Sequence, residues 1–383
     1  MKIRTSALLL LAALALSSCG ASHRAEKSGA VTSRQTVTSR TTTSPPKSFS
    51  LALISARSGA VLHLSKLPVA SAVADGRDGW FVSGGFGLAR LLPNGKLDSA
   101  WGTRESRNLN CSRCGLVKSG SRLYVAGQRF EVVPGTVGEA RVSVVEAFDA
   151  STGARLWVGS APSRDVYALA ASSTRVYVGG AFTSVGNVKR QGLAAFDATT
   201  GRLLDWRAPS FHLSDTTSHI GALALSGSRL YVGGLFEAVG DKSRNYIAAL
   251  DPATGALLPW NPKNAGSAAY SVFEILVTRG QVVIAGDDGF AAASARTGRQ
   301  LGWTSSIDGN AGRFAADGPL VYLGGGLRDP IRAFRGNNLA AFNLQTGRLT
   351  SWAPKLAPYV DVGGIVPSGR QVLVTGMFTD SIG

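Results

Sequence analysis

The sequence predicts an all-β protein, a seven-bladed β-propeller of four-stranded antiparallel blades. Three observations lead to this fold class. Beyond residue 48, short apolar runs alternate with Gly, Asp and Pro, and no long helical period occurs. Two strand-like segments recur together at a spacing of about 50 residues, which is the period of kelch-type propeller blades. The two ends of the chain read as the two halves of one further repeat.

The N-terminus has the pattern of a secretory signal peptide. Lys2 and Arg4 precede an apolar run from Ala7 to Leu16, and small residues follow it. The run is shorter than the roughly 20 apolar residues that a membrane-spanning helix needs. The Leu-Ser-Ser-Cys tetrad that ends at Cys19 resembles the lipobox of bacterial lipoproteins, which implies cleavage before Cys19 and diacylation of its thiol. We therefore expect residues 1–18 to be removed and the protein to be anchored outside the cytoplasm, at the cell surface or in the periplasm. Ordinary secretion with a free Cys19 is the alternative.

A tether is expected over residues 19–48, and the propeller domain over residues 49–383. The tether is rich in Ser, Thr, Arg and Lys and has no apolar period. Such a segment cannot bury enough apolar surface to offset the entropy lost on ordering, so we expect it to be disordered. The hydrophobic content of the chain, 44%, is that of a protein that can build a large core.

The repeat unit has two recognisable pieces. The first piece is RVYVGGAF over Arg175–Phe182 and RLYVGGLF over Arg229–Phe236. The second piece runs from an apolar strand through Asp and Gly to Trp, as in Leu193–Trp206. Its Asp accepts hydrogen bonds from backbone amides further along the turn, and its Gly supplies the positive φ that closes the hairpin. Further copies of the second piece cover Leu88–Trp101, Ala147–Trp157, Ile247–Trp260, Ala291–Trp303 and Leu339–Trp352.

The chain ends are expected to share one composite blade. Gly369–Gly383 contains a first piece without its second piece. At the other end, Leu51–Gly59 aligns without a gap onto Leu193–Gly201. We therefore expect the C-terminus to supply the two inner strands of this blade and the N-terminus its two outer strands. Closure of this kind leaves no open sheet edge, and it brings the number of blades to seven.

The pattern Ala-x-Asp-x-x-Thr-Gly followed by Trp resembles the tryptophan-docking repeats of the quinoprotein family, spread over most of residues 49–383. The resemblance implies that each Trp packs against the neighbouring blade. Dehydrogenases of that family have eight blades, an adjacent cysteine pair and a calcium site beneath a quinone. This sequence has no adjacent cysteines, so we expect no cofactor. Lipoprotein propellers of the outer-membrane assembly type are similar in anchor and fold, which implies a protein-binding scaffold.

The sequence assigns no catalytic or metal-binding residue. The expected domain contains only the histidines His63, His212 and His219. His212 and His219 lie in one loop around Asp215, a spacing that could hold a metal, although solvated loop histidines have the same spacing. No Gly-rich phosphate loop and no Ser-His-Asp arrangement is evident from spacing.

Cys111 and Cys114 are separated by two residues. An exported protein meets an oxidising environment, so we expect a local disulfide between them, near the mouth of the central channel. Free thiols, redox chemistry or a metal half-site are the alternatives. A four-ligand zinc site would need two further ligands that the sequence does not indicate.

Charge is the main indication of a partner. The formal net charge is +16, and the expected domain keeps an excess of cations. Loops between second and third strands should emerge on the same face as the loops between blades. A basic face raises the local concentration of anionic partners, although a merely solvated surface has the same composition. The expected ligand-binding residues are Lys189, Arg190, Lys242, Arg244, Arg328, Arg332 and Arg335; the loops between blades add Arg104, Arg107, Arg113, Arg164, Lys263 and Lys355.

Three functions fit these patterns. The first is a binding or scaffold module for a protein or an anionic envelope polymer such as a polysaccharide. The second is an enzyme at the channel mouth, either a hydrolase, a lyase or a quinoprotein-like oxidoreductase. The third is a structural envelope protein without a small ligand. The sequence contains no strong catalytic motif, so it favours the first function, in a protein expected to be monomeric. Nucleic acid is not an expected partner, because export separates the protein from it.

Overall fold

The computed structural model describes residues 48–109, 111–132, 139–214, 218–262, 271–286, 289–301, 309–327, 339–352, 354, 356 and 361–379. They belong to a compact unit, Pro46–Gly383. The expected signal peptide, Cys19 and the tether up to residue 47 lie outside the described residues. Ser48, the last residue of the expected tether, already belongs to a strand and pairs with Thr379.

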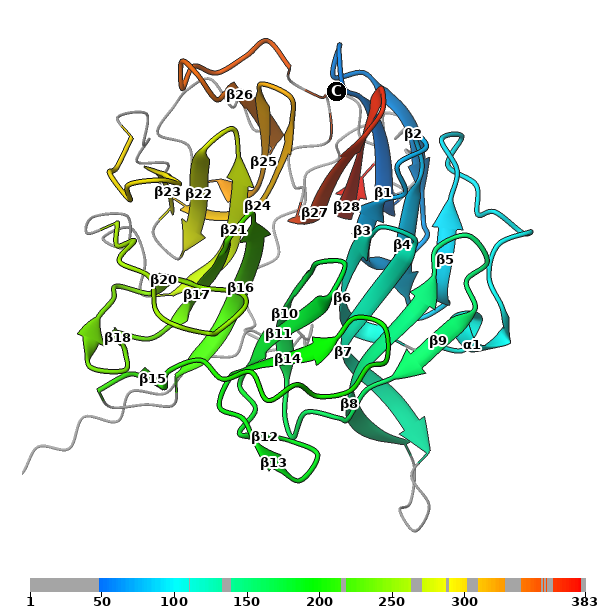
Figure 1. Ribbon diagram of the computed structural model, residues 1–383. Coiled ribbons are helices and arrows are strands. Elements are labelled where there is room, and N and C mark those ends of the chain that lie inside the picture. Colours follow the sequence, from blue (N-terminus) through cyan, green and yellow to red (C-terminus); the bar gives the residue numbers. More distant parts are fainter. Residues whose placement is uncertain are drawn as a thin grey trace, which may run out of the picture. The chain divides into compact units, whose positions relative to one another are not determined.

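Antiparallel sheets of three or four strands follow one another along the chain, as expected for a β-propeller (Figure 1). Their strands are β3 (Val69–Ala74), β4 (Trp80–Gly84) and β5 (Gly87–Leu91); β6 (Cys111–Ser119), β7 (Arg122–Val132), β8 (Glu139–Asp149) and β9 (Arg155–Val158); β10 (Val166–Ala171), β11 (Arg175–Gly180) and β14 (Leu193–Asp197); β16 (His219–Ser226), β17 (Arg229–Leu235) and β20 (Ile247–Leu250); β21 (Val272–Thr278), β22 (Gln281–Gly286) and β23 (Gly289–Ser294); β24 (Gly309–Asp317), β25 (Leu320–Leu327) and β26 (Leu339–Asn343).

Small elements lie in the connections. In the described part of the chain the one helix is α1 (Arg104–Arg107). Two small sheets are formed by short strands, β12 (Ser184–Val185) with β13 (Val188–Lys189), and β15 (Phe211–His212) with β18 (Ala238–Val239) and β19 (Lys242–Ser243). Each falls in a loop after a second strand or before a first strand.

One sheet joins the two ends of the chain. Its order is β2 (Val61–Ser65), β1 (Ser48–Ser55), β28 (Gln371–Thr379) and β27 (Asp361–Ser368). Strands β1 and β28 are antiparallel, with Leu51 opposite Thr375 and Ser55 opposite Gln371. The pairing expected between the chain ends is therefore confirmed, and Figure 1 shows β1 beside β28.

The outermost strand is shorter than expected in most sheets. Only two sheets of the described chain have four strands. Elsewhere the segment after the turn makes a single antiparallel bridge with the third strand, as between Phe196 and Leu203. The chain then leaves the sheet, so that the following Trp can reach the next sheet. The equivalent bridges are Leu91 with Leu97, Leu250 with Leu257, Ala293 with Gln300 and Phe342 with Leu349.

The turn before this segment is stabilised by the side chain of the Asp residue that begins it. The Asp197 carboxylate accepts hydrogen bonds from the amides of Thr199 (2.9 Å) and Thr200 (2.8 Å). Gly201 follows with a φ of 71°. A Cβ on Gly201 would lie 2.5 Å from Cε3 of Trp157 in the preceding sheet, so both backbone conformation and space require glycine here.

Aromatic side chains hold each sheet to the next. Tyr177 contacts Trp206 edge to face at a centroid distance of 5.4 Å, and both are buried. Most of these indoles also donate a hydrogen bond to a turn carbonyl of the following sheet, which confirms the packing role expected for the repeated Trp. The bonds run from Trp101 to Ala150 O (3.0 Å), Trp157 to Ala198 O (3.1 Å), Trp260 to Ser294 O (2.9 Å) and Trp352 to Ser55 O (2.9 Å).

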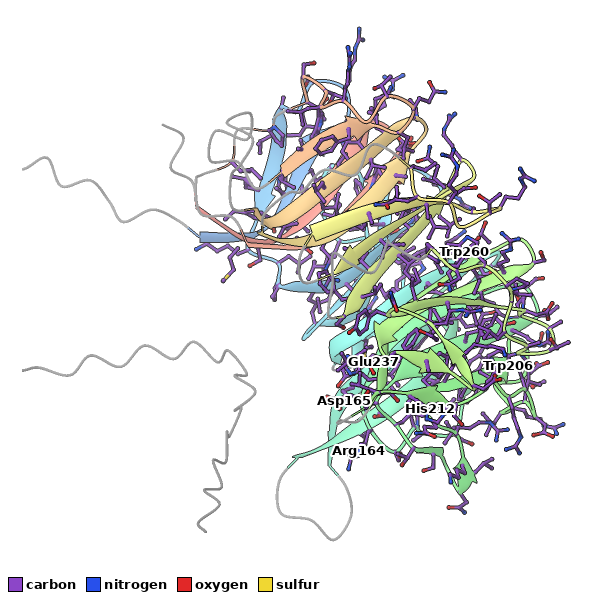
Figure 2. The ribbon with its side chains drawn as sticks, turned by 90° about the vertical axis from the view of Figure 1, so that its left-hand side faces the viewer. Arg164, Asp165, Trp206, His212, Glu237 and Trp260 are labelled. Carbon is purple, nitrogen blue, oxygen red and sulfur yellow. The ribbon has the colours of Figure 1, made fainter. Side chains whose placement is uncertain are left out.

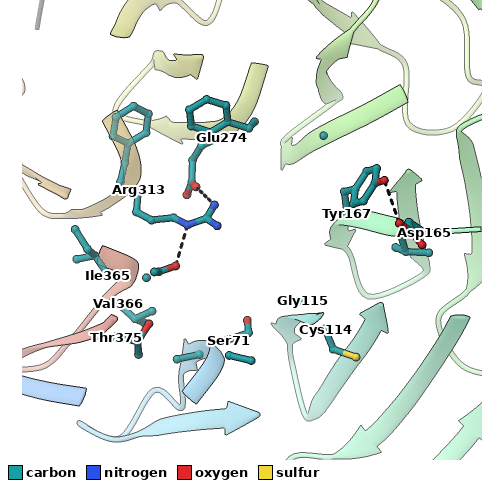
Figure 3. Close-up of a pocket in the computed structure, with 18 of the residues that line it drawn as sticks. Ser71, Cys114, Gly115, Asp165, Tyr167, Glu274, Arg313, Ile365, Val366 and Thr375 are labelled. Atoms are coloured by element: carbon teal, nitrogen blue, oxygen red, sulfur yellow. Dashed lines mark hydrogen bonds and ion pairs between the residues drawn. The ribbon is translucent and has the colours of Figure 1, made fainter. Parts of the chain in front are cut away.

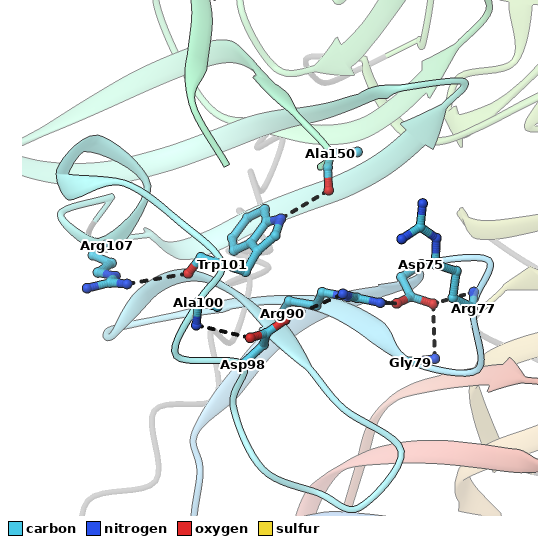
Figure 4. Close-up of polar contacts among 9 residues, drawn as sticks. All are labelled: Asp75, Arg77, Gly79, Arg90, Asp98, Ala100, Trp101, Arg107 and Ala150. Carbon is cyan, nitrogen blue, oxygen red and sulfur yellow. Dashed lines mark hydrogen bonds and ion pairs between the residues drawn. The ribbon is translucent and has the colours of Figure 1, made fainter. Parts of the chain in front are cut away.

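The β3–β4–β5 sheet contains a buried ion pair (Figure 4). The Asp75 side chain is 2% exposed, and Arg90 donates to its Oδ2 at 2.7 Å. Burial alone would raise the pKa of Asp75. The amides of Arg77 and Gly79 and the Arg90 guanidinium all donate to the carboxylate and hold its pKa below the usual value. Arg90 also reaches Asp98 at 3.4 Å, which joins the third strand to the segment beyond it.

Trp352 and Trp206 make a matched pair for testing the hydrogen bond between sheets. Both indoles are buried, but within the described residues the Trp206 Nε1 has no acceptor. We expect Trp352→Phe to destabilise the protein by about 1 kcal/mol more than Trp206→Phe, because only Trp352→Phe removes a hydrogen bond between sheets, from the indole to Ser55 O. Urea unfolding measures the difference. Equal losses would contradict a stabilising role for the hydrogen bond.

Asp75→Asn should destabilise the protein in a pH-dependent way. A carboxyl group whose pKa is lowered by folding stabilises the protein above its unfolded pKa, about 4, and this contribution disappears as the pH falls through the folded value. We expect a loss of about 2 kcal/mol at neutral pH, shrinking below about pH 4. Denaturant unfolding at several pH values tests this, with exposed Asp78→Asn as the control. A difference independent of pH would argue against the assignment.

Candidate functional site at the channel mouth

A cavity of about 660 Å³ opens where the first strands of the sheets converge (Figure 3). The first strands are β3, β6, β10, β16, β21, β24 and β27, and all of them contribute lining residues. Each contacts the first strand of the next sheet, and β27 contacts β3. Most lining residues lie near the beginnings of these strands, so we call this space the channel-mouth cavity.

A β-bulge near the start of each first strand shapes the cavity. The register with the second strand shifts by one residue at equivalent places, for example between Val166 and Ala168 and between Ile220 and Ala222. A bulge redirects the side chain of the extra residue. In β10 that residue is Tyr167, whose 50% exposure is unusual for a large aromatic residue in a first strand. In β16 and β27 it is a glycine, Gly221 or Gly363, so no side chain enters the cavity from these positions.

A polar cluster holds Tyr167 in place. The Tyr167 hydroxyl donates to Asp165 Oδ2 at 3.2 Å, and the amide of Gln128 donates to Asp165 Oδ1. The His219 ring meets the phenol edge to face at a centroid distance of 5.7 Å. Burial lowers the pKa of His219, which keeps this imidazole neutral at pH 7. The cluster therefore presents one carboxylate and one fixed aromatic face to the cavity.

An ion pair faces this cluster across the cavity, as Figure 3 shows. Arg313 Nη1 lies 3.1 Å from Glu274 Oε2, and Arg313 Nε donates to Gly363 O at 2.9 Å. Burial raises the pKa of Glu274, while the Arg313 charge opposes this rise. The Arg313 side chain is 44% exposed and the Glu274 side chain 24% exposed. The pair links β21, β24 and β27, and it leaves part of the Arg313 side chain open to a ligand.

This arrangement is suited to binding. Its polar groups are few, converge on one space and are oriented by partners, as in preformed ligand sites. The residues do not match a quinone above a calcium ion: Glu274 is held by Arg313, and the described residues contain no group of three or more His, Cys, Asp or Glu placed to hold a metal.

Comparisons with known proteins identify the family. A family model described as "Outer membrane protein assembly factor BamB" matches residues 28–353. The chain belongs to the BamB family. The expected likeness to quinoprotein-like propeller repeats is thereby confirmed. Comparison with curated proteins gives no match.

One solved structure similar to this BamB-family chain is the crystal structure of the computationally designed Ika8 protein. It is 16% identical and has a TM-score of 0.49, and the match covers 81% of this chain and 95% of that chain. Within the described ranges, this BamB-family chain has no helix with the length and apolar character that crossing a membrane requires.

Two of the arginines expected to bind a ligand, Arg190 and Arg244, are buried in the fold. Arg190 is 5% exposed and donates to Lys189 O and Leu204 O, at 3.0 and 2.9 Å. Arg244 is 9% exposed and makes the equivalent bonds to Ser243 O and Leu258 O. Both loops fold back as small hairpins, which turns the guanidinium inward toward the segment after the third strand. This placement corrects the expectation that these two charges are displayed on the surface.

The other expected residues have mixed positions. Lys189 and Lys242 are exposed, and Lys242 is paired with Asp241 at 3.0 Å. Arg328, Arg332 and Arg335 lie outside the described residues. Cys114 lines the channel-mouth cavity, is buried and is disulfide-bonded. The side chain of Cys111, its expected partner, also lies outside the described part of the chain.

Sequence reasoning missed the main residues of the cavity, Asp165, Tyr167, Gln128, Glu274 and Arg313. In Figure 2, Arg164, Asp165, His212 and Glu237 lie toward one side of the sheets, and Trp206 and Trp260 lie toward the other.

The repeat pattern contains a signal that could have identified the cavity residues. In each repeat, the residues that begin the first strand should reach the channel. Aligning those positions would have marked Asp165, Tyr167 and His219.

Proposed function

We propose that this protein is an extracytoplasmic, lipid-anchored, seven-bladed β-propeller that acts as a binding or scaffold module through the channel-mouth cavity. The seven first strands support the blade number, and the composite sheet supports closure of the ring. Diacylation of Cys19 would hold the domain at a membrane surface.

The channel-mouth cavity carries the proposal. Its lining combines an exposed phenol, a carboxylate and a partly exposed guanidinium, contributed by different sheets. Tyr and Arg are the residues that most often dominate protein–protein binding energy, because they provide large contact areas with fixed polar groups. The phenol is already oriented by Asp165, so little side-chain entropy is lost when a partner binds.

A protein partner fits this surface best. A cavity of about 660 Å³ accommodates a short peptide loop or a few side chains. The description of the matching family model names an outer membrane protein assembly factor, which supports a scaffold role for this chain. We propose that a partner protein inserts a segment between Tyr167 and Arg313.

Site-specific photo-crosslinking in the native envelope tests this surface. A benzophenone amino acid at Tyr167 should give a discrete protein adduct, because this position borders the cavity. The same group at Leu156, which is 45% exposed on β9, should give none. Arg313→Gln should weaken the adduct at Tyr167 severalfold while leaving the folded spectrum unchanged. An adduct at Leu156 alone, or an adduct at Tyr167 insensitive to Arg313→Gln, would refute the assignment.

Lipid anchoring is tested separately by metabolic labelling with a fatty acid. The native chain should incorporate the label and remain in the membrane fraction. Cys19→Ala should lose the label and appear in the soluble or secreted fraction, while Ser18→Ala should retain the label. Labelled Cys19→Ala protein would show that the anchor is elsewhere or absent.

A further inference from the structure

The turns of the sheets gather on the side opposite the channel-mouth cavity. In β11 and β14, Arg175 is opposite Asp197, so the turn before Arg175 lies beside the turn after Asp197. The register is equivalent in the composite sheet, where Gln371 is opposite Ser55. Neighbouring sheets meet here as well, since the Tyr177 hydroxyl donates to Pro252 O at 2.6 Å. We call this side the turn face, and the side of the channel-mouth cavity the loop face.

The turn face carries many exposed cations without carboxylate partners. Within the described chain, none of them forms an ion pair. Among contacts between described residues, Arg279 alone of this group donates a side-chain hydrogen bond, to Gly318 O at 2.7 Å. These exposed residues are Arg57, Arg77, Lys96, Arg202, Arg279, Arg296, Arg299, Arg348 and Arg370.

The loop face differs in how its charges are arranged. Two of its described cations have carboxylate neighbours: Lys242 lies 3.0 Å from Asp241, and Arg313 lies 3.1 Å from Glu274. Such neighbours reduce the field that an anionic ligand would meet. The turn face carries the larger group of unpaired cations named above, on the side opposite the loops from which a basic face was expected.

Three carboxylates on the turn face, those of Asp149, Asp197 and Asp251, are engaged by the backbone. Asp251 accepts hydrogen bonds from the amides of Ala253 and Thr254, at 2.8 and 2.7 Å, and Asp149 and Asp197 make the same type of turn. These bonds lower the pKa values of the three residues, so they stay ionised. Their charge is partly offset by amide dipoles, and the surrounding guanidinium groups remain without ion pairs.

A recess of about 320 Å³ lies on the turn face between the β16–β17–β20 and β21–β22–β23 sheets. Arg229 and Arg296 both line it, together with the hydroxyl residues Ser228 and Thr297. Arg229 is half-buried and directs one Nη toward Ala295 O, which fixes its guanidinium at the wall. Asp251 also lines the recess, with its Oδ1 directed to its own turn. Two guanidinium groups and two hydroxyls suit a phosphate group.

We propose that the turn face binds a phosphate-bearing polymer and that this recess takes one of its phosphate groups. A flexible chain can contact cations distributed over successive turns, so many weak contacts add up. A lipid bilayer is a poorer match, because the described turns expose no large hydrophobic side chain that could enter a membrane. This surface is separate from the channel-mouth cavity, so either proposal can fail without the other.

Polyphosphate binding by matched charge variants tests the proposal. The chain from Gly20 onward retains the compact unit Pro46–Gly383 and lacks Cys19. We expect it to bind inorganic polyphosphate at low salt, with an affinity that falls steeply as salt rises. The triple variant Arg296→Gln, Arg299→Gln, Arg348→Gln should lose affinity about tenfold. The loop-face triple Arg164→Gln, Lys189→Gln, Lys242→Gln removes the same charge and should change affinity less than about twofold.

Three results would overturn the inference. Equal losses in the two triple variants would show that only net charge matters. The absence of polyphosphate binding at low salt would exclude the turn face as a phosphate-polymer site. Binding to phosphatidylglycerol vesicles that the turn-face triple weakens, without comparable polyphosphate binding, would identify a membrane surface as the partner. Circular dichroism of each variant establishes that it is folded.

Discussion

The antiparallel pairing of β1 with β28 is the constraint on which the rest of the structure depends. These strands come from opposite ends of the compact unit, and their backbone hydrogen bonds complete the sheet that also contains β27. Strand β27 contacts the first strands on both of its sides, β24 and β3. Without this pairing β27 and β28 would have no outer strands, and the first strands would lose a neighbour on which the channel-mouth cavity depends. Sequence-distant backbone pairing therefore supports the strands β27 and β28 that contribute lining residues to the cavity.

The repeated turn serves two structural purposes at once. Its Asp side chain accepts hydrogen bonds from the backbone amides of the turn, which fixes the backbone. Carbonyl groups of the turn then lie at the edge of the sheet, where they can accept hydrogen bonds from the preceding sheet. The preceding sheet then donates to those carbonyls from Trp or Tyr side chains. Trp206 is an exception to this hydrogen bonding between sheets. In the sheet that follows it, Pro252 O already accepts hydrogen bonds from Tyr177 and Arg175. The Trp206 indole has no acceptor among the described residues.

The repeat pattern predicted the fold at the level of strands and turns. Leu51–Gly59 aligned with Leu193–Gly201, and the structure has the corresponding register between β1 and β28. The short outermost segments could not be predicted, because Leu203 retains the apolar character of a strand residue while the chain leaves the sheet to place Trp206. The inward direction of the Arg190 side chain could not be predicted from the sequence either, because it depends on a hairpin only two residue pairs long. The channel-mouth cavity combines Gln128, Asp165 and Arg313, whose proximity follows only from the ring of first strands.

The difference between the two faces follows from the lengths of their connections. On the loop face the connections are longer, and a cation can lie beside a carboxylate, as Lys242 does with Asp241. On the turn face the connections are tight turns, and the acidic residues of three of them, Asp149, Asp197 and Asp251, already accept backbone amides. A cation that follows the turn glycine, such as Arg202, influences the Asp197 carboxylate through space without reaching ion-pair distance. The same turn chemistry that makes the blades regular therefore leaves guanidinium groups available on one side of the molecule. The channel-mouth cavity, with its ion pair and aromatic ring, and the unpaired cations of the turns make two surfaces of different chemistry, so the two proposals concern separate sites.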